Sequence, residues 1–322
     1  MDKINLLVLG TPGARHLQRL DELRPVANLV IGDHLEALRD AAPQADVILN
    51  AGLEGDLLQR IFPLATRLRW LHSMSTGVEH VLAPQVVASP VPLTNARGVF
   101  RTVLAEFVMA ACFFFAKDLR RLVRSQDAGV WDQFDVEEIR GRVLGVVGYG
   151  EIGRACAELA HGFGMRVVAA RRRPALAGGD PLLDAIYPPD RLREMLASCD
   201  YVSVSTPQTP ATRNLIGEPE LRAMKPTAVL INVGRGTVVD EAALIRALEE
   251  NWIRGAALDV FGEEPLPCGH PFYRLQNVLL SPHSADHTSD WKERSIDCFV
   301  KNFHRFVKGE PLENLVDKQA GY

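Results

Sequence analysis

A glycine-rich hexapeptide, GYGEIG, has the spacing of a turn that binds the phosphates of a dinucleotide. In such a turn Gly148 permits a tight bend, Gly150 lets the backbone approach the pyrophosphate, and Gly153 lets a helix pack on a strand. The backbone N–H groups of Glu151 and Ile152 open the expected helix and would bind the phosphates, aided by the helix dipole. The hexapeptide therefore predicts a dinucleotide cofactor, with an unliganded strand–turn–helix unit as the alternative.

Three consecutive arginines, Arg171, Arg172 and Arg173, stand where a dinucleotide-binding fold usually carries an Asp or Glu. That acid hydrogen-bonds the adenosine ribose of NAD, and it would repel the extra phosphate that NADP carries on this ribose. Arginine instead holds a phosphate, often through two parallel hydrogen bonds. The run therefore favours NADP(H) as the cofactor and leaves NAD(H) possible, with a solvated basic turn as the alternative.

These segments require a scaffold of alternating strands and helices. Short runs rich in Val, Ile and Leu recur along the chain, as in residues 142–148, 201–206 and 228–234. Runs that are apolar almost throughout are typical of parallel strands covered on both faces. Segments of helical period separate them, as in 240–250, where Asp240 stands near the expected N-cap. The pattern predicts an α/β protein with two doubly wound parallel-sheet domains.

Two long helices are expected to connect the domains. Residues 98–126 contain no proline and only one glycine, at their start, so we expect one long helix there. Residues 289–311 are expected to form another, ended at Gly309. A chain that leaves one domain through a helix and returns through another makes the first domain discontinuous. The expected domains are a substrate-binding domain, 1–98 with 286–322, and a dinucleotide-binding domain, 99–285.

The composition of the 322 residues is that of a soluble globular protein, with 47% hydrophobic and 24% charged residues. A net charge of −4 argues against a general nucleic-acid binder. The longest apolar run, 107–116, is too short to cross a bilayer, and the N-terminal run is too short for a signal peptide. Five scattered cysteines argue against a disulfide framework. We expect a cytoplasmic protein that binds neither nucleic acid nor membrane.

Seven further motifs accompany the glycine turn: STGVEH (75–80), TNARGVF (94–100), LAEF (104–107), STPQTPATRNLI (205–216), LINVGRGTVVDE (230–241), ALDVFGEEPLP (257–267) and LLSPHSADHT (279–288). Together they resemble the D-isomer-specific 2-hydroxyacid dehydrogenase family, most closely its glyoxylate/hydroxypyruvate reductases, over nearly the whole chain. The resemblance implies a flavodoxin-like substrate domain and a Rossmann nucleotide-binding domain. It also implies hydride transfer from NADPH to a small 2-keto acid, such as glyoxylate or hydroxypyruvate, to give a D-2-hydroxy acid.

The resemblance implies three catalytic residues. Arg235 would bind the carboxylate and carbonyl oxygens of the substrate, and its planar guanidinium suits that geometry. His283 would donate the proton, while Glu264 would orient the imidazole and raise its pKa. Glu263 is the rival acid, but the family register gives the role to the residue before Pro265.

The same register implies further contacts, each with ordinary turn chemistry as its alternative. The backbone N–H groups of Thr76 and Gly77 would bind the substrate carboxylate. Asp259 would contact the nicotinamide carboxamide. The other implied cofactor contacts are Thr206, Pro207 and Val233.

No metal site is expected. His283 and His287 have the spacing HxxxH, but Ser284 stands where a zinc motif of this kind needs Glu. The two histidines are therefore not expected to bind zinc together.

Two departures from the family pattern bear on the cofactor and the substrate. NAD-dependent members have Asp where Arg171 stands, which puts NAD in doubt and leaves the fold unaffected. Arg97 stands near the expected cleft and is either a second substrate contact or a surface residue.

Three alternatives on the same fold remain. One is a dinucleotide-sensing corepressor or scaffold, which the joint presence of Arg235, Glu264 and His283 argues against. Another is an NAD-dependent phosphoglycerate-type dehydrogenase, which we expect to carry a regulatory domain beyond the second long helix. A formate dehydrogenase should pair the histidine with Gln, and the sequence has no such arrangement.

The resemblance also implies a homodimer. The helix at 98–126 and an arm at 127–134 are expected to form its interface. Trp131 is expected to anchor this interface, or else to reach the neighbour's cleft.

Overall fold

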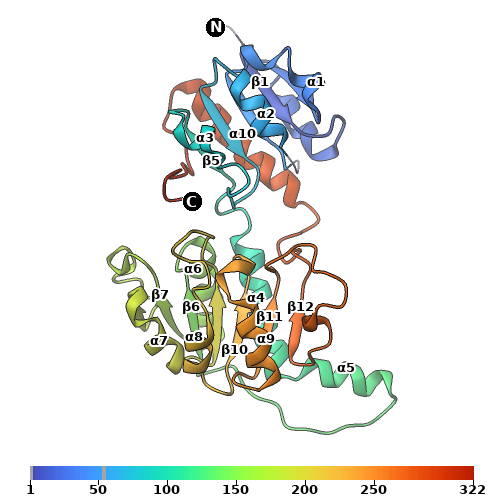
Figure 1. Ribbon diagram of the computed structural model, residues 1–322, viewed down its shortest axis with the longest axis vertical. Coiled ribbons are helices and arrows are strands. Elements are labelled where there is room, and N and C mark those ends of the chain that lie inside the picture. Colours follow the sequence, from blue (N-terminus) through green and yellow to red (C-terminus); the bar gives the residue numbers. More distant parts are fainter. Residues whose placement is uncertain (1–2, 53–55) are drawn as a thin grey trace. The chain divides into compact units, whose positions relative to one another are not determined.

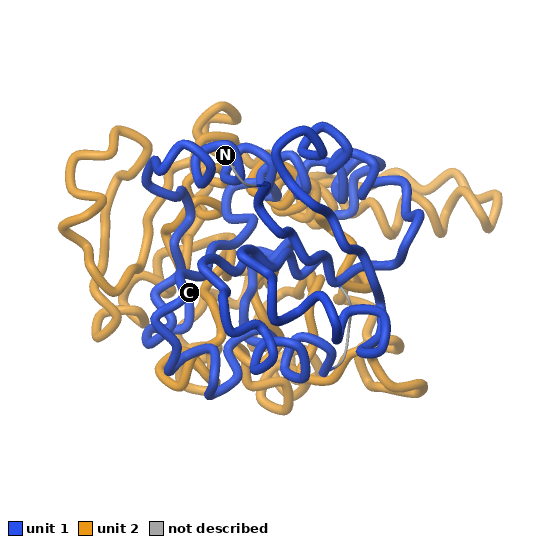
Figure 2. Tube along the Cα trace, turned by 90° about the horizontal axis from the view of Figure 1, so that it is seen from above, with its two compact units in different colours: residues 1–100, 287–322 blue, residues 101–286 orange. Residues whose placement is uncertain are grey.

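The chain divides into two compact units in the computed structural model, which describes residues 3–52 and 56–322. Unit 1 comprises residues 1–100 and 287–322, and unit 2 comprises residues 101–286 (Figure 2). The divisions thus fall after Phe100 and Asp286, where the sequence had suggested residues 98 and 285. Unit 1 is discontinuous because the chain leaves it and later returns.

A parallel five-stranded sheet forms the centre of unit 1, in the order β2-β1-β3-β4-β5 (Figure 1). Its strands are β1 (Ile4–Leu9), β2 (Ala27–Gly32), β3 (Val47–Asn50), β4 (Trp70–Ser73) and β5 (Leu93–Asn95). This is the flavodoxin-like strand order, which confirms the expected fold of this unit.

A hydrophobic core lies on each face of the unit 1 sheet, and successive residues of a strand contribute to opposite faces. In β1, Leu7 packs into a core on one face, and Leu6 packs into a core on the other. Trp70 of β4 stacks on Phe299, with ring centroids 5.1 Å apart. The helical segments of unit 1 are η1 (Arg15–Leu23), α1 (Leu35–Leu38), η2 (Ala42–Gln44), α2 (Leu57–Ile61), η3 (Phe62–Leu64), α3 (Pro84–Ala88) and α10 (Trp291–Lys308).

A parallel seven-stranded sheet forms the centre of unit 2, in the order β12-β11-β10-β9-β6-β7-β8. Its strands are β6 (Val143–Val147), β7 (Arg166–Ala170), β8 (Ala185–Tyr187), β9 (Tyr201–Val204), β10 (Val229–Asn232), β11 (Gly255–Leu258) and β12 (Val278–Leu280). From β8 to β11 this is the Rossmann order, with β12 added at one edge. The strand order reverses between β6 and β9, and this reversal places the glycine turn beside the end of β9. The edge strand β8 is the one strand that the apolar runs did not predict.

The helical segments of unit 2 are α4 (Arg101–Ala116), α5 (Leu119–Asp127), α6 (Glu151–Gly162), η4 (Pro174–Ala177), η5 (Pro189–Arg191), α7 (Leu192–Ser198), α8 (Glu218–Ala223), η6 (Gly236–Val238), α9 (Glu241–Glu249) and η7 (Pro271–Tyr273). The expected N-cap of α9 is present, because the Asp240 side chain accepts a hydrogen bond from the Ala243 N–H. Among the described residues, no helix is both long enough and apolar enough to span a membrane.

The expectation of one continuous helix over residues 98–126 is wrong. The helix begins at Arg101 and breaks after Ala116, and a second helix begins at Leu119. Asp118 between them has φ 44° and ψ 52°, which is the left-handed region that Asp enters more readily than most residues. The break turns α5 away from the body of unit 2. The second long helix ends as predicted, at Gly309 with φ 72°.

Candidate active site

The glycine turn joins β6 to α6 with two closely packed glycines and one open glycine. Gly148 has φ 98°, and a Cβ at Gly153 would lie 2.6 Å from the Gly148 oxygen. A side chain at either position would therefore strain or displace the turn. A Cβ at Gly150 would meet no heavy atom within 4 Å, so the backbone there faces open space.

The first turn of α6 offers N–H donors toward that space. The helix begins at Glu151 with no side-chain cap, and the first N–H groups of a helix have no partner within it. Glu151 itself pairs with Arg101 at 3.1 Å, which compensates the carboxylate charge near the turn. The uncapped turn is suited to a phosphate.

The end of β9 lies against the same glycine turn. The Ser205 hydroxyl donates a hydrogen bond to the Gly148 oxygen at 2.9 Å, and a Cβ at Gly148 would lie 2.9 Å from Thr206 N. The Thr206 hydroxyl is buried and has no hydrogen-bond partner among the residues that the structure describes. A buried hydroxyl without a partner is uncommon in a finished protein interior. A dinucleotide on the turn would supply polar atoms there, so these residues fit such a cofactor.

The other two expected contacts nearby lie in the same region of unit 2. The Pro207 carbonyl accepts a hydrogen bond from the Thr212 hydroxyl at 2.6 Å, which fixes the loop after β9. Val233 is buried, and its N–H donates to the Val204 oxygen at 3.1 Å. Both residues therefore belong to the strand ends that border the glycine turn.

The three arginines follow β7, the strand next to β6. Arg171 is half-buried and its N–H donates to the Tyr187 oxygen at 3.2 Å, while Arg172 and Arg173 are exposed. The positive charge of Arg171 also acts on the Tyr149 hydroxyl, whose pKa it lowers against a larger upward shift from burial. Because Tyr149 belongs to the hexapeptide, Arg171 at the start of the arginine run lies close to the glycine turn.

Asp180 joins the arginine segment to the glycine turn, and sequence reasoning missed it. Its carboxylate accepts hydrogen bonds from the Tyr149 hydroxyl at 2.9 Å, from Arg154 Nε at 3.2 Å and from Leu182 N at 3.1 Å. The Leu182 hydrogen bond has the largest effect on the pKa of Asp180, which lies below its ordinary value. With three donors on it, this carboxylate is already satisfied by the protein.

Arg235 lies on a turn that β10 and its last residue fix. The Asn232 side chain is 1% exposed, and its Oδ1 accepts from Gly234 N at 3.1 Å. Its Nδ2 donates to the Arg235 oxygen at 3.1 Å. Asn232 therefore holds both ends of the turn, and no catalytic motif in the sequence had pointed to it.

Gly236 brings this turn into contact with the loop after β11. A Cβ on Gly236 would lie 1.9 Å from the carbonyl carbon of Phe261, far inside any permitted contact. The Phe261 N–H in turn donates to Glu264 Oε1 at 2.8 Å. The missing side chain at Gly236 thus sets the spacing between the Arg235 turn and the Glu264 loop.

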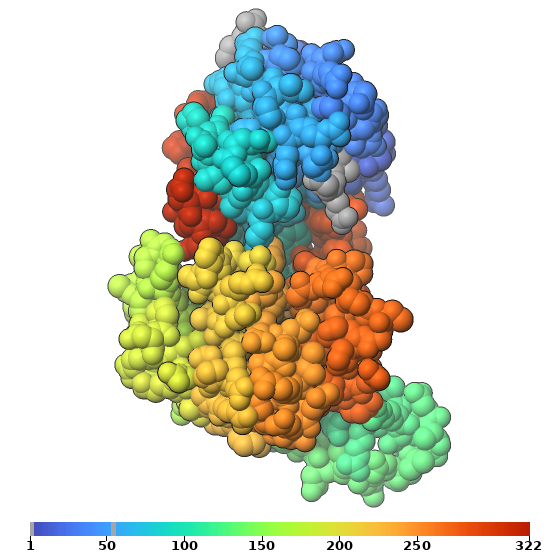
Figure 3. All heavy atoms as spheres, viewed as in Figure 1, coloured from blue at the N-terminus to red at the C-terminus, as the bar shows by residue number. Residues whose placement is uncertain are grey.

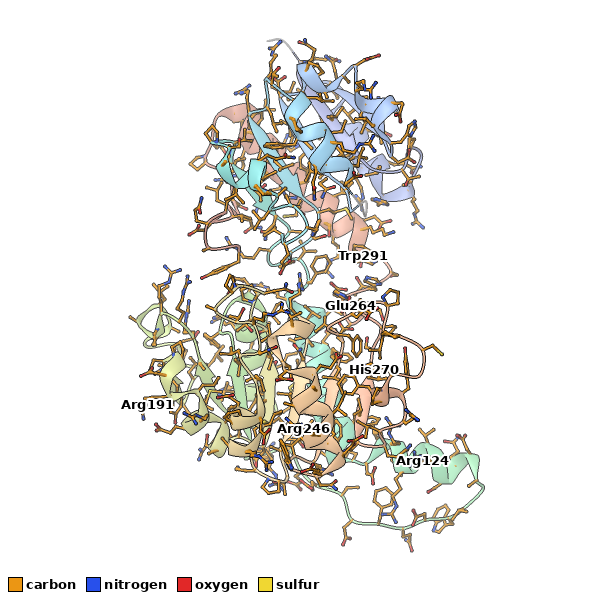
Figure 4. All side chains as sticks on the ribbon, in the orientation of Figure 1. Arg124, Arg191, Arg246, Glu264, His270 and Trp291 are labelled. Carbon is orange, nitrogen blue, oxygen red and sulfur yellow. The ribbon has the colours of Figure 1, made fainter. Side chains whose placement is uncertain are left out.

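His283 and Glu264 form a hydrogen-bonded pair, with 2.6 Å between Nδ1 and Oε2. Figure 4 labels Glu264 at the edge of unit 2. The hydrogen bond that His283 donates to Glu264 is the largest influence on the pKa of His283 and raises it, against the opposing effect of burial. Partial burial raises the pKa of Glu264, but the hydrogen bonds from His283 and Phe261 outweigh it, so the net shift is downward. Arg235 is close enough for its charge to lower both pKa values.

Asp259 anchors the loop that carries His283. It is 1% exposed, and its Oδ1 accepts hydrogen bonds from the Ser281 hydroxyl at 2.6 Å and from Ser284 N and Ala285 N at 3.0 Å. The backbone N–H of His283 donates to the backbone carbonyl oxygen of Asp259 at 2.9 Å. This anchoring role was not foreseen, and a contact between Asp259 and a nicotinamide stays a prediction.

Unit 2 thus brings Arg235, Glu264 and His283 together, whereas Thr76 and Gly77 belong to unit 1. His287 also belongs to unit 1, where its ring stacks on Trp291 with centroids 4.8 Å apart. Among residues 3–52 and 56–322, no three or more His, Cys, Asp or Glu side chains gather where they could hold a metal ion.

Comparison with known proteins agrees with this geometry. A family model described as "D-isomer specific 2-hydroxyacid dehydrogenase, NAD binding domain" matches residues 109–285. The chain belongs to this family. It is an NAD(P)-dependent oxidoreductase. The match to the family model confirms the family that the sequence motifs indicated.

Relatives and solved structures extend the similarity over both units. The chain is 35% identical to a glyoxylate reductase of Aeropyrum pernix over 303 residues, which cover 88% of this chain and 87% of the relative. A family structure from Aeromonas salmonicida has a TM-score of 0.86 at 27% identity and covers 98% of this chain and all of its own. Another family structure, from Xanthobacter autotrophicus in complex with NADPH and MES, has a TM-score of 0.82 at 28% identity. The match covers 99% of this chain and 100% of that chain.

Replacing Glu264 should shift the pH dependence of the enzyme. With His283 as the expected proton donor, reduction would need its protonated form, so activity should fall as the pH rises through the pKa that Glu264 raises. Glu264→Gln removes the negative charge, so the basic limb of the pH profile of kcat/KM should move to lower pH. At pH 8 we expect kcat/KM to fall by about one to two orders of magnitude.

The neighbouring Glu263→Gln is the matched control, and its pH profile should be that of the wild type. A basic limb that moves with Glu263→Gln and not with Glu264→Gln would reverse the assignment of the two acids.

Adding one methyl group at Gly236 should damage catalysis without removing a catalytic side chain. The new Cβ would force the Phe261 backbone away and alter the distance between Arg235 and Glu264. Gly236→Ala should therefore lower kcat/KM about a hundredfold, as small misplacements of reacting groups do. At Gly262 a Cβ would lie 3.5 Å from the nearest atom, an ordinary contact, so Gly262→Ala is the control. Equal activity of the two variants would contradict this role of Gly236.

Proposed function

We propose that this enzyme reduces small 2-keto acids, glyoxylate or hydroxypyruvate first, to D-2-hydroxy acids, and that it uses NADPH in preference to NADH. The His283–Glu264 pair beside Arg235 carries the proposal, because a proton donor and an anion-binding cation are what the reaction asks of the protein. The 35% identical glyoxylate reductase of Aeropyrum pernix supports the choice of substrate.

Each catalytic side chain has one task in this reaction. Arg235 binds the substrate carboxylate and carbonyl oxygen and stabilises the charge that grows on that oxygen. Glu264 engages Nδ1 of His283, so Nε2 is the nitrogen that faces the substrate and gives its proton to the oxygen. A reduced nicotinamide, when bound, supplies the hydride for the carbonyl carbon. In the reverse direction His283 takes the proton back, and Glu264 stabilises the imidazolium.

The cofactor preference rests on Arg171, Arg172 and Arg173. These residues offer guanidinium groups close to the glycine turn, where a 2′-phosphate would need them. Asp180 contacts the hexapeptide through the Tyr149 hydroxyl, and three donors already occupy its carboxylate. It is therefore poorly placed to accept ribose hydroxyls as the acid of an NAD site does. The NADPH complex of the Xanthobacter autotrophicus relative also supports the choice.

The two units divide the work in this proposal. Unit 2 holds the dinucleotide through Gly148, Gly150, Gly153 and the first turn of α6. Unit 1 supplies the backbone N–H groups of Thr76 and Gly77 for the substrate carboxylate. We propose the cytoplasm as the site of this reaction.

We also propose that the enzyme is a homodimer built on α5 and the arm after it. This part of unit 2 projects from the rest of the unit (green in Figure 3) and exposes large apolar side chains. Trp131 is 91% exposed and Val123 56%, and such exposure on a projecting element is typical of an interface. Sedimentation velocity should show a dimer for the wild type and a monomer for Val123→Asp combined with Trp131→Ala.

A panel of purified reactions tests the activity. The wild type is mixed with NADPH or NADH and a series of 2-keto acids, and nicotinamide absorbance is followed. We expect turnover of glyoxylate or hydroxypyruvate, and chiral analysis of a product with a stereocentre should find the D isomer. Failure to reduce any 2-keto acid would refute the proposed activity.

Exchange of the arginines tests the cofactor preference separately. Arg171→Asp combined with Arg172→Ala should lower the ratio of kcat/KM for NADPH over NADH by about tenfold or more, since charge-assisted hydrogen bonds to a phosphate are lost. Calorimetry with adenosine 2′,5′-bisphosphate should show the same loss without turnover. Arg166→Ala, at the start of the same strand, is the control. A wild type that prefers NADH would refute the argument from these arginines.

A further inference from the structure

The segment Glu313–Lys318 adds an antiparallel edge to the sheet of unit 1, beside β5. The N–H of Val316 donates to the Leu93 oxygen at 2.9 Å, and the N–H of Asn95 donates to the Asn314 oxygen at 3.3 Å. Leu315 pairs with Thr94 as an antiparallel bridge. We refer to Glu313–Lys318 as the edge segment; it lies in the red part of the chain near β5 (Figure 1).

Asn314 holds the backbone at the carboxyl end of β5. Its side-chain amide donates to the Arg97 oxygen at 2.9 Å and to the Asn95 oxygen at 3.3 Å. Its φ of 57° lies in the left-handed region, which Asn tolerates better than most residues. One side chain thus fixes two carbonyl groups in the turn that follows the strand.

Asn95 connects this turn to the loop that contains Thr76, through a side-chain hydrogen bond. Asn95 is 5% exposed, and its Nδ2 donates to the Thr76 oxygen at 2.7 Å. The same loop is held twice more, by Thr76 Oγ1 to the Ala96 oxygen at 3.3 Å and by Ala96 N to the Ser75 oxygen at 3.2 Å. The position of Thr76 therefore depends on the turn that Asn314 fixes.

Because the peptide bond is planar, the hydrogen bond from Asn95 to the Thr76 carbonyl also fixes the direction of the Gly77 N–H. The Thr76 carbonyl and the Gly77 N–H belong to one planar trans peptide, so the two groups point in opposite directions. With the carbonyl directed at Asn95, the Gly77 N–H is directed away from it. Within the described part of the chain, this N–H makes no protein hydrogen bond. It is thus a fixed donor, available to a ligand.

The edge segment is itself secured at both ends. At its start, the Asn302 side chain exchanges two hydrogen bonds with the Glu313 backbone, at 2.8 and 2.9 Å. At its end, Lys318 Nζ donates to the oxygens of Val86 and Val91, at 3.0 and 2.9 Å, and also to that of Ser89. These anchors fix the register that places Asn314 over the end of β5.

We propose that the edge segment, through Asn314 and Asn95, is the positioning element of the loop that binds the substrate carboxylate. The inference rests on the proposed function, because that function assigns binding of the substrate carboxylate to Thr76 and Gly77. The edge segment that would position these two residues lies more than two hundred positions away from them in the chain. Asn314 is a positioning residue: it contacts the loop's supports and not the substrate.

Asn314→Gly tests this role most cleanly. Glycine accepts the left-handed backbone without strain, so the substitution removes the amide hydrogen bonds to the Arg97 and Asn95 oxygens and a longer contact, 3.9 Å, with Cys298 Sγ. The KM for glyoxylate should rise about tenfold, in keeping with the loss of hydrogen bonds that fix the loop. The KM for NADPH, the kcat and the pH profile should each stay within about twofold of the wild type, since unit 2 is untouched.

Leu315→Ala is the matched control. Leu315 is 53% exposed and joins β5 through its backbone, so its truncation should leave all four parameters at wild-type values. A KM for glyoxylate in Asn314→Gly equal to that in Leu315→Ala would overturn the inference. So would an equal rise in the KM for NADPH, which would indicate general damage.

Loss of stability does not obscure the result, because KM does not depend on the fraction of molecules that are folded. If Asn314→Gly yields no soluble protein, Lys318→Met loosens the same segment from its other end and should raise the same KM by about threefold. An unchanged KM in an active variant overturns this inference alone. A wild type without activity on any 2-keto acid overturns the proposed function first, so the two failures are distinguishable.

Discussion

The absence of a side chain at Gly236 is the constraint on which the catalytic arrangement depends. Parallel strands end at one edge of a sheet, so the segments after β10, β11 and β12 are neighbours in space although they are far apart in sequence. Adjacency alone leaves such loops separated by a layer of side chains. At Gly236 no side chain intervenes, and the backbone of the Arg235 turn meets that of Phe261 directly. Phe261 then orients Glu264, and Glu264 orients His283.

The charges around the half-exposed His283 determine the direction in which its pKa is shifted. Glu264 and Asp259 both raise the pKa of His283, while burial and Arg235 oppose them. The net shift is upward, so the protonated form of His283 persists to higher pH than that of a free imidazole. Arg235 limits this rise, and it adds to the lowering of the pKa of Glu264 that the hydrogen bonds from His283 and Phe261 produce. The cation that we propose to bind the substrate therefore also moderates the pKa of the proposed proton donor.

The sequence predicted what depends on local pattern and missed what depends on tertiary contacts. Among the described residues, eleven of the twelve strands followed from apolar runs, but β8 has three half-buried residues and gave no such run. The helix break at Asp118 went unseen, because no glycine or proline marks it. Arg235, Glu264 and His283 were found through family motifs. Asp180 was not, because it contacts the glycine turn from well beyond the arginine run, and no spacing rule covers that distance.

In each unit, a buried asparagine at the end of a strand fixes the loops beside it through the same kinds of hydrogen bond. Asn232 ends β10 and Asn95 ends β5, and in each case Oδ1 accepts a hydrogen bond from the N–H two residues later. In each case Nδ2 donates to a carbonyl of a loop at the same sheet edge, that of Arg235 or that of Thr76. An amide can do both because it carries a donor and an acceptor, whereas a carboxylate lacks the donor. A buried Asn at the end of a strand thus provides rigidity without adding a charge, so the positive charge of the Asn232 turn is that of Arg235.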